Sequence, residues 1–130
     1  TSVFFLVLIV LSSVALLVGG IGVMAIMMVS VTDRTKEIGL RKAVGATTGD
    51  IRLQFLVEAA TLTGIGGIIG VLTGAALGKL ATVLLDITTA FPVTLTIIAV
   101  TSSIVIGIVF GLIPANRAAR LDPVDALRYE

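Results

Sequence analysis

Three long stretches of this sequence contain no Asp, Glu, Lys or Arg, and they constrain the fold more than any other feature. They cover residues 1–32, 59–78 and 91–116. A helix needs about 20 apolar residues to cross a bilayer, and a crossing segment must satisfy its own backbone hydrogen bonds. Alternating segments of about ten residues, typical of a membrane β-barrel, are absent. We therefore expect an all-α membrane protein with three transmembrane helices, at about residues 3–31, 59–85 and 92–113.

The composition supports a bilayer as the solvent. Hydrophobic residues make up 57% of the chain and charged residues 13%, with a mean hydropathy of +1.18, outside the range of soluble domains. The first run would reach about 48 Å as a helix, against a hydrocarbon core of roughly 30 Å. We expect it to tilt, or to project beyond the outer surface. The chain opens inside this run at Thr1, without the features of a signal peptide, which indicates the C-terminal piece of a longer protein.

The positions of the basic residues predict the orientation. Eight of the nine lie in the connector after the first span or in the tail, namely Arg34, Lys36, Arg41, Lys42, Arg52, Arg117, Arg120 and Arg128. With three spans, the connector and the tail must lie on one side of the membrane. Because Lys and Arg favour the cytoplasmic side, we expect a plasma-membrane protein whose first span starts outside and whose tail, residues 114–130, is cytoplasmic.

The connector, residues 32–58, has the pattern of a helix, a break and a second helix. Glu37 and Arg41 form an i,i+4 pair in the favourable order, and Arg34 lies on the same face. Gly45 suits a left-handed helix end. Thr47 and Asp50 then have the spacing of a capping box.

The second connector helix should carry Ile51, Phe55 and Leu56 on one side and bend into the second span. Val31 and Ile38, seven residues apart, should continue a face of the first span into the connector in one helix. A stiff connector held by membrane spans at both ends can transmit a push. On charge alone, a solvated connector that simply obeys the positive-inside rule explains the same residues.

The second span carries four glycines on one helical face, at every fourth residue: Gly66, Gly70, Gly74 and Gly78. Small residues let another helix approach closely, which drives packing in lipid. We expect this glycine ladder to contact a helix of the same chain or of a second copy. The alternative is the general enrichment of glycine in membrane helices.

In the tail, Asp122 is suited to cap a short helix that has Pro123 in its first turn. We expect an interfacial helix there, the alternative being a frayed end. The sequence offers no catalytic, cofactor-binding or metal site. It has no His and no Cys, its serines lack an activating base, and "TGAALGKL" departs from the phosphate-binding loop at both ends. No nucleic-acid partner is expected.

Two blocks of sequence resemble a known family. "MVSVTDRTKEIGLRKAVGATTGDIRLQFLVEA", followed by the glycine-rich span, and "GLIPANRAARLDPVDALRYE" resemble the C-terminal permease domain of MacB/FtsX-type ABC transporters, in particular the macrolide-exporter branch. The resemblance covers essentially the whole chain. It implies a permease with four membrane helices, of which this chain supplies the last three, and a large outer domain between the first and the second.

The resemblance also implies partners. A coupling helix in the first cytoplasmic loop would dock on an ABC ATPase, as a subunit or a fused domain. ATP would bind there and not to this chain. By position, the contact would fall on Gly45, Ala46, Thr47, Thr48, Asp50, Ile51 and Gln54. The motion of the ATPase would reach the outer domain through the helices, in a scheme called mechanotransmission. A second permease protomer and an extracytoplasmic adaptor are further expected partners.

Three functions fit these expectations. The first is a permease that couples ATP hydrolysis to export. The second is an FtsX-like transmembrane lever that regulates an outer hydrolase or a signalling partner without transport. The third is a small self-assembling pore or scaffold, with which no ATPase would associate.

Overall fold

The computed structural model describes residues 2–86, 88, 90 and 92–129, and within these ranges the regular structure is entirely helical. The helices are α1 (Ser2–Asp33), α2 (Thr35–Ala43), α3 (Thr48–Leu85), α4 (Val93–Ala119) and α5 (Pro123–Arg128). Three of them, α1, α3 and α4, are long and apolar enough to cross a membrane, which confirms the predicted all-α fold with three membrane-spanning helices. The segment between α3 and α4 lies partly outside the described residues.

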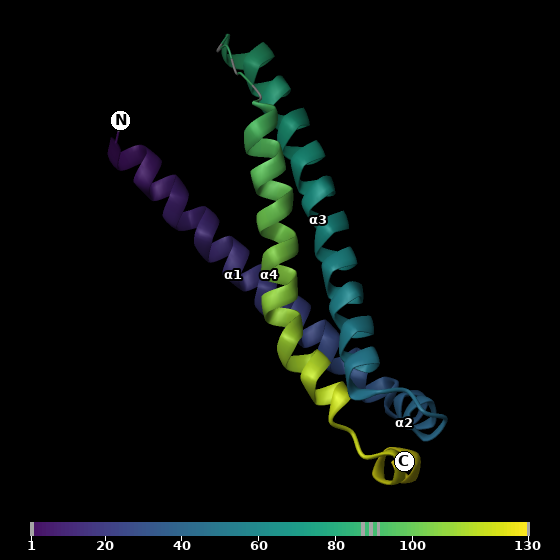
Figure 1. Ribbon diagram of the computed structural model, residues 1–130. Helices are drawn as coiled ribbons and strands as arrows, with labels where there is room; N and C mark the ends of the chain where they lie inside the picture. Colours follow the sequence, from purple (N-terminus) through teal and green to yellow (C-terminus); the bar gives the residue numbers. More distant parts are fainter. Residues whose placement is uncertain (1, 87, 89, 91, 130) are drawn as a thin grey trace.

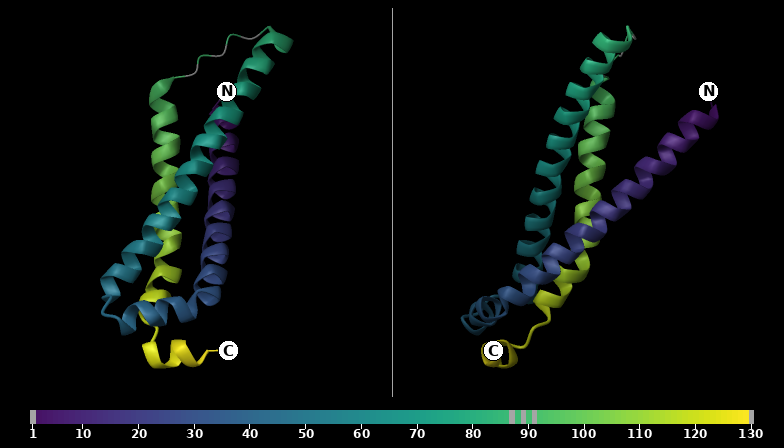
Figure 2. Two further views of the ribbon diagram at one scale, coloured as in Figure 1. Left: turned by 90° about the vertical axis from the view of Figure 1, so that its right-hand side faces the viewer. Right: turned by 180° about the vertical axis from the view of Figure 1, so that it is seen from behind.

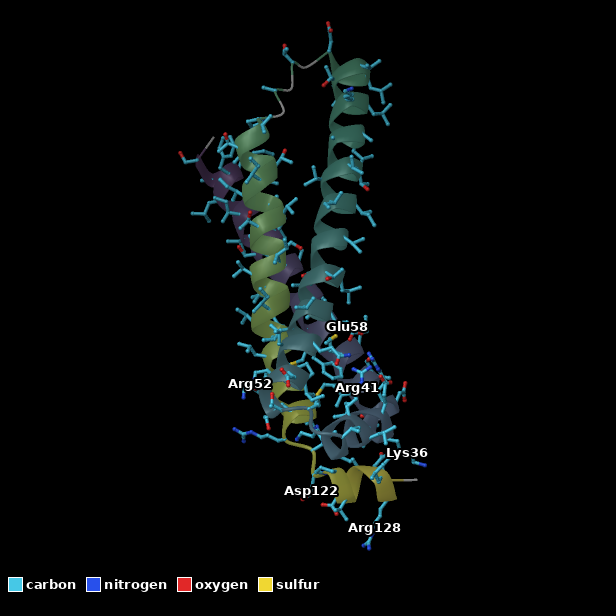
Figure 3. All side chains as sticks on the ribbon, turned by 45° about the vertical axis from the view of Figure 1, so that its right-hand side comes forward. Lys36, Arg41, Arg52, Glu58, Asp122 and Arg128 are labelled. Atoms are coloured by element: carbon cyan, nitrogen blue, oxygen red, sulfur yellow. The ribbon has the colours of Figure 1, made fainter. Side chains whose placement is uncertain are left out.

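The three long helices place the connector and the tail at one end of the bundle, as the odd number of spans predicts (Figure 1). We call this end the polar end. The labelled charged residues of Figure 3 all lie there, on α2, α3 and the tail. The N-terminal end of α1 and the α3–α4 connection lie at the opposite end (Figure 1).

Helices α3 and α4 form a tightly packed antiparallel pair, because small side chains line both surfaces. An added Cβ on Gly107 of α4 would lie 2.5 Å from Cγ2 of Thr63. One turn further along α4, a Cβ on Gly111 would lie 2.7 Å from Cβ of Ala59. The hydroxyl of Ser103 also donates a 2.8 Å hydrogen bond to the backbone carbonyl of Thr63. Close backbone approach of this kind is what stabilises helix pairs in lipid.

Helix α1 packs against the pair only over the half nearer the polar end. Its crossing point with α4 is Gly20, where an added Cβ would lie 2.5 Å from the ring of Phe110. Beyond the crossing, α1 diverges from α3 and α4 (Figure 2). An inclined helix accommodates the excess length of this span.

A hydrophobic core lies where the helices converge at the polar end. It contains Met27, Val31, Ile38, Ile51, Phe55, Ala59, Ala115, Ala118 and Ala119. Phe55 and Met27 are each 1% exposed. Elsewhere the long helices present apolar side chains outward, as helices in contact with lipid do.

Two details of the connector differ from the sequence prediction. The first span does not continue straight into the connector, because α1 ends at Asp33 and α2 leaves in a new direction after Arg34 (Figure 2). The hydroxyl of Thr35 donates to the carbonyls of Val31 and Thr32, and such bonds to a preceding turn bend helices. The second difference concerns α3. A bend is predicted between the connector and the second span, whereas α3 runs from the connector into the span as one helix.

Candidate functional site

The break between α2 and α3 is a fully formed Schellman turn centred on Gly45. The amide of Ala46 donates to the carbonyl of Arg41, and the amide of Gly45 donates to the carbonyl of Lys42. Gly45 has a φ of +110°, a region that glycine enters without steric cost. This confirms the predicted left-handed helix end and satisfies carbonyls that the end of α2 would leave free.

The start of α3 is closed by the predicted capping box. The hydroxyl of Thr47 accepts from the amide of Asp50 at 3.2 Å, and the Asp50 carboxylate accepts from the amide of Thr47 at 2.9 Å. Two otherwise free amides are therefore satisfied at an exposed helix start. Turn and cap together give this loop a defined shape although it faces solvent.

The residues expected to contact a partner separate into exposed and buried groups. Gly45, Thr47, Thr48 and Asp50 are exposed, and Ala46 and Gln54 are partly buried. The side chain of Ile51 lies in the core instead, with 2% exposure. Ile51 therefore anchors α3 and offers no side-chain surface to a partner. The available surface is the turn itself and the first turn of α3.

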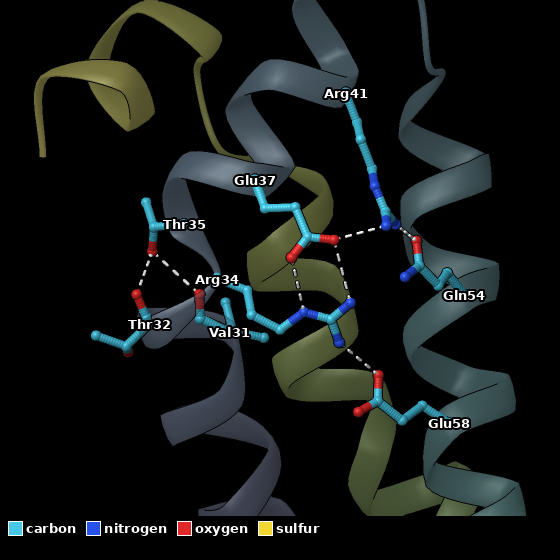
Figure 4. Close-up of polar contacts among 8 residues, drawn as sticks. All are labelled: Val31, Thr32, Arg34, Thr35, Glu37, Arg41, Gln54 and Glu58. Atoms are coloured by element: carbon cyan, nitrogen blue, oxygen red, sulfur yellow. Dashed lines mark hydrogen bonds and ion pairs between the residues drawn. The ribbon is translucent and has the colours of Figure 1, made fainter.

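A polar network holds α2 against α3 (Figure 4). Glu37 accepts from Arg34 at 3.3 Å and pairs with Arg41 at 2.6 Å. Each arginine then reaches α3: Arg34 pairs with Glu58 at 3.2 Å, and Arg41 donates to the amide oxygen of Gln54. The guanidinium of Arg34 also lies 5.7 Å from the ring centroid of Phe55.

This network contains the predicted group of Arg34, Glu37 and Arg41 and extends it. The partners on α3, Glu58 and Gln54, are 24 and 13 residues away in sequence from Arg34 and Arg41 respectively. No short-range spacing could identify them. Gln54 was expected at a partner contact, whereas here it accepts from Arg41 and links the two connector helices.

The arginines lower the pKa of Glu37 below its ordinary value, chiefly through the hydrogen bonds from Arg34 and then through the charges of Arg34 and Arg41. The hydrogen bond to Glu37 in turn raises the pKa of Arg34. Because the pKa of Glu37 is lowered by folding, its contribution to stability is present at neutral pH. That contribution is lost as the pH falls through the lowered pKa.

We expect Glu37→Gln to accelerate amide hydrogen exchange in residues 35–43 by about two- to fivefold at neutral pH, the size typical of exposed ion pairs. At each pH, the exchange rate of the variant is divided by that of the wild type. This ratio should approach one at acidic pH, where Glu37 is protonated in the wild type. Asp33→Asn, which removes an acid outside the network, is the matched control. A pH-independent ratio would contradict the assignment.

The tail forms the predicted short helix. The carboxylate of Asp122 accepts from the amide of Val124 at 2.9 Å, and Pro123 occupies the first helical position. Helix α5 lies against α2 (Figure 2). Ala126 is 2% exposed, and an added Cβ on Gly39 would lie 2.6 Å from the Ala126 Cβ.

Three glycines of the ladder make no close contact within this chain. An added Cβ on Gly66, Gly70 or Gly74 would meet nothing within 4 Å. These glycines line an open, mainly apolar groove of about 620 Å³, with Leu16 and Leu95 among its other lining residues. The helix contact made within this chain therefore uses other small residues. Contact of the ladder with a second copy stays a prediction.

Known proteins with similar sequences identify the family. The FtsX-like permease C-terminal family matches residues 4–123. The macrolide export ATP-binding/permease protein MacB of Nitrobacter winogradskyi is 50% identical over 117 residues, which are 90% of this chain and 18% of that protein. The ABC transporter permease YknZ of Bacillus subtilis, named as uncharacterized, is 48% identical over 120 residues, 92% of this chain and 30% of that protein.

A second MacB, of Syntrophobacter fumaroxidans, is 53% identical over 117 residues, which are 90% of this chain and 16% of that protein. The chain thus spans less than a third of the length of these relatives. These matches cover at least 90% of this chain, and three of its helices can span a membrane. Together the two observations assign the chain to a family. This chain belongs to the FtsX-like permease family, as the C-terminal domain of a MacB-like ABC transporter permease.

Proposed function

We propose that this domain transmits the motion of an ABC ATPase across the plasma membrane and that the whole protein uses this motion for export. The connector, residues 32–58, is the receiving element on the cytoplasmic side. The observation that carries the proposal is the capped turn between α2 and α3, which is exposed and defined in shape. The connector that contains this turn joins the membrane helices α1 and α3. Several similar proteins are named as combined ATP-binding and permease proteins, which supports an ATPase as the partner.

The charge distribution supports the orientation. Eight of the nine basic residues belong to the connector or the tail, and both lie at the polar end (Figure 3). The positive-inside rule places this end in the cytoplasm. The start of α1 then lies on the outer side, where α1 can pass the motion to an extracytoplasmic domain. An extracytoplasmic adaptor would be a further partner there.

A second copy of the permease is the remaining proposed partner within the membrane. The face formed by Gly66, Gly70, Gly74 and Gly78 is its proposed contact. Its first three glycines are open in this chain, and small residues at this spacing allow close helix approach.

The spans favour movement of the helices over passage of a polar solute between them. In this sequence, residues 59–78 and 91–116 carry no charge, whereas ion-coupled carriers place ionisable residues within their spans. This also suits a second function, an FtsX-like lever that regulates an outer hydrolase or signalling partner. Loss of export after mutation of the connector, measured in cells, would favour the first function, and loss of hydrolase activation would favour the second.

Single cysteines at Thr47, Thr48 and Asp50 test the proposal, because these side chains are exposed and the chain contains no cysteine. In the full-length protein, with other cysteines replaced, we expect a membrane-impermeant thiol reagent to spare these positions in sealed cells. It should label a control cysteine at Thr88, which is exposed between α3 and α4. The reverse pattern would refute the orientation.

The same cysteines test the contact with the ATPase. Positions 47, 48 and 50 should form crosslinks to the ATPase, fused or separate, and the Thr88 position should form none. Absence of crosslinks from all three positions, in a complex that still contains the ATPase, would refute the coupling role. It would leave the family assignment intact.

A further inference from the structure

The last turn of α2 carries a lysine that binds the end of α4. The ammonium of Lys42 donates to the backbone carbonyl of Leu121 at 2.8 Å and to that of Ala119. The two acceptors are 79 and 77 residues away along the chain. The last four carbonyls of a helix lack partners within it, and a cation there also meets the negative end of the helix dipole. Lys42 therefore closes α4 from a different element.

The same side of the connector receives the tail helix. Besides its close approach to Ala126, an added Cβ on Gly39 would lie 3.4 Å from the carbonyl oxygen of Pro123. Only a residue without a side chain lets α5 lie so near α2. Asp122 and Pro123 fix the start of α5, so the tail is a folded element seated on the connector.

Two sets of contacts thus determine how α2 is oriented. Arg34 and Arg41 join it to α3 through Glu58 and Gln54. Lys42 joins it to α4, and Gly39 provides the seat for α5. Because α2 lies between the bend at Arg34 and the turn at Gly45, these contacts set the direction of the turn that follows.

We propose that Lys42 is a positioning residue for the ATPase contact: it binds the carbonyl end of α4 and, together with α5 seated on Gly39, makes the C-terminal tail part of the unit that receives the ATPase's motion. This inference rests on the proposed function. It assigns to the tail a role in coupling. It also distinguishes Lys42 from Lys36, which lies on the same helix and is exposed.

The test uses the full-length permease with its ATPase in lipid nanodiscs. Lys42→Met keeps the length of the side chain and removes its donors. Lys42→Arg keeps donors and charge, and Lys36→Met is the matched control. Crosslinking from a cysteine at Thr48 reports docking. Spin labels at Val7 of α1 and Val83 of α3, both exposed, report movement at the far end of the bundle when ATP and vanadate are added.

We expect Lys42→Met to reduce the fraction of molecules that move by about tenfold, because hydrogen bonds from a charged group are among the stronger ones. Lys42→Arg keeps the donors and the charge, and Lys36 is an exposed charge, so both Lys42→Arg and Lys36→Met should stay within about twofold of wild type. Gly39→Val, which displaces α5 without altering the ammonium, should resemble Lys42→Met. In every variant, the backbone amides of α3 and α4 should remain as well protected from hydrogen exchange as in the wild type.

The remaining outcomes decide between failure of this inference and failure of the proposed function. Equal movement in Lys42→Met and Lys36→Met would overturn the inference, and so would a loss of movement accompanied by loss of α3 and α4 protection. If the wild-type protein gives no crosslink from Thr47, Thr48 or Asp50 although the ATPase is present, the proposed function fails. If the wild type crosslinks and moves and Lys42→Met moves equally well, only the inference fails.

Discussion

Gly107→Leu should prevent α3 and α4 from packing, and it is the substitution with the largest expected effect on stability. A Cβ at Gly107 would lie 2.5 Å from Cγ2 and 2.7 Å from Cβ of Thr63, far inside van der Waals contact. Overpacking a well-packed site costs about 1–3 kcal/mol, occasionally more. Leucine adds four carbons where the two backbones lie closest. We therefore expect the free energy of unfolding to fall by an amount at or above the top of this range. The loss of stability is measured as a lower midpoint temperature of unfolding in detergent, with size-exclusion chromatography to quantify the folded protein that remains after heating.

Gly70→Leu, in the open groove lined by the glycine ladder, is the matched control. It adds the same side chain where nothing lies within 4 Å of a Cβ. We expect its thermal midpoint as a monomer to match wild type, whereas association of two copies should weaken if the glycine ladder is their contact. A wild-type midpoint for Gly107→Leu would contradict the packing described above. A monomer destabilised by Gly70→Leu would show that the ladder packs within the chain.

Gly45→Ala should have the largest effect on ATPase docking without disturbing the spans. Gly45 has a φ of +110°, and left-handed conformations cost a residue with a Cβ about 1–2 kcal/mol. The Schellman hydrogen bonds from Gly45 and Ala46 depend on this conformation. We therefore expect the turn to open and crosslinking from Thr48 to the ATPase to fall about tenfold.

Gly49→Ala provides the control for this prediction. Gly49 lies in the first turn of α3, four residues further along the chain, and an added Cβ would meet only the Thr47 hydroxyl, at 3.8 Å. Alanine favours a helix over glycine by about 1 kcal/mol, so this variant should retain crosslinking. Equal crosslinking in the two variants would show that the shape of the turn does not determine docking.

The sequence predicted the features that depend on short-range interactions. The break at Gly45, the cap formed by Thr47 and Asp50 and the helix start at Asp122 all involve groups within a few residues of one another. Each follows from the free amides and carbonyls at helix ends. The membrane spans were equally predictable, because the cost of burying charge in lipid depends on composition and length.

The sequence was less informative about which surfaces make contact. In lipid, every face of a span is apolar, so the hydrophobic pattern does not mark the packed side as it does in a soluble helix. The four-residue glycine repeat of the second span therefore predicts a contact face, whereas within this chain α3 packs against α4 through Ala59, Thr63 and Gly67. Similarly, Ile51 was expected at a partner contact, but it fits the core between α3 and its neighbours.

The sequence by itself determined that this chain has three segments long and apolar enough to cross a membrane and that its connector and tail share one end, because charge, length and parity act without reference to any fold. It also determined the caps and the turn, since their partners are local. Only the tertiary structure decided that α2 departs from the line of α1, that Arg34 reaches Glu58 and that Lys42 closes α4. Those contacts join residues far apart in the chain, and only the packing of the hydrophobic core at the polar end brings them within hydrogen-bonding distance.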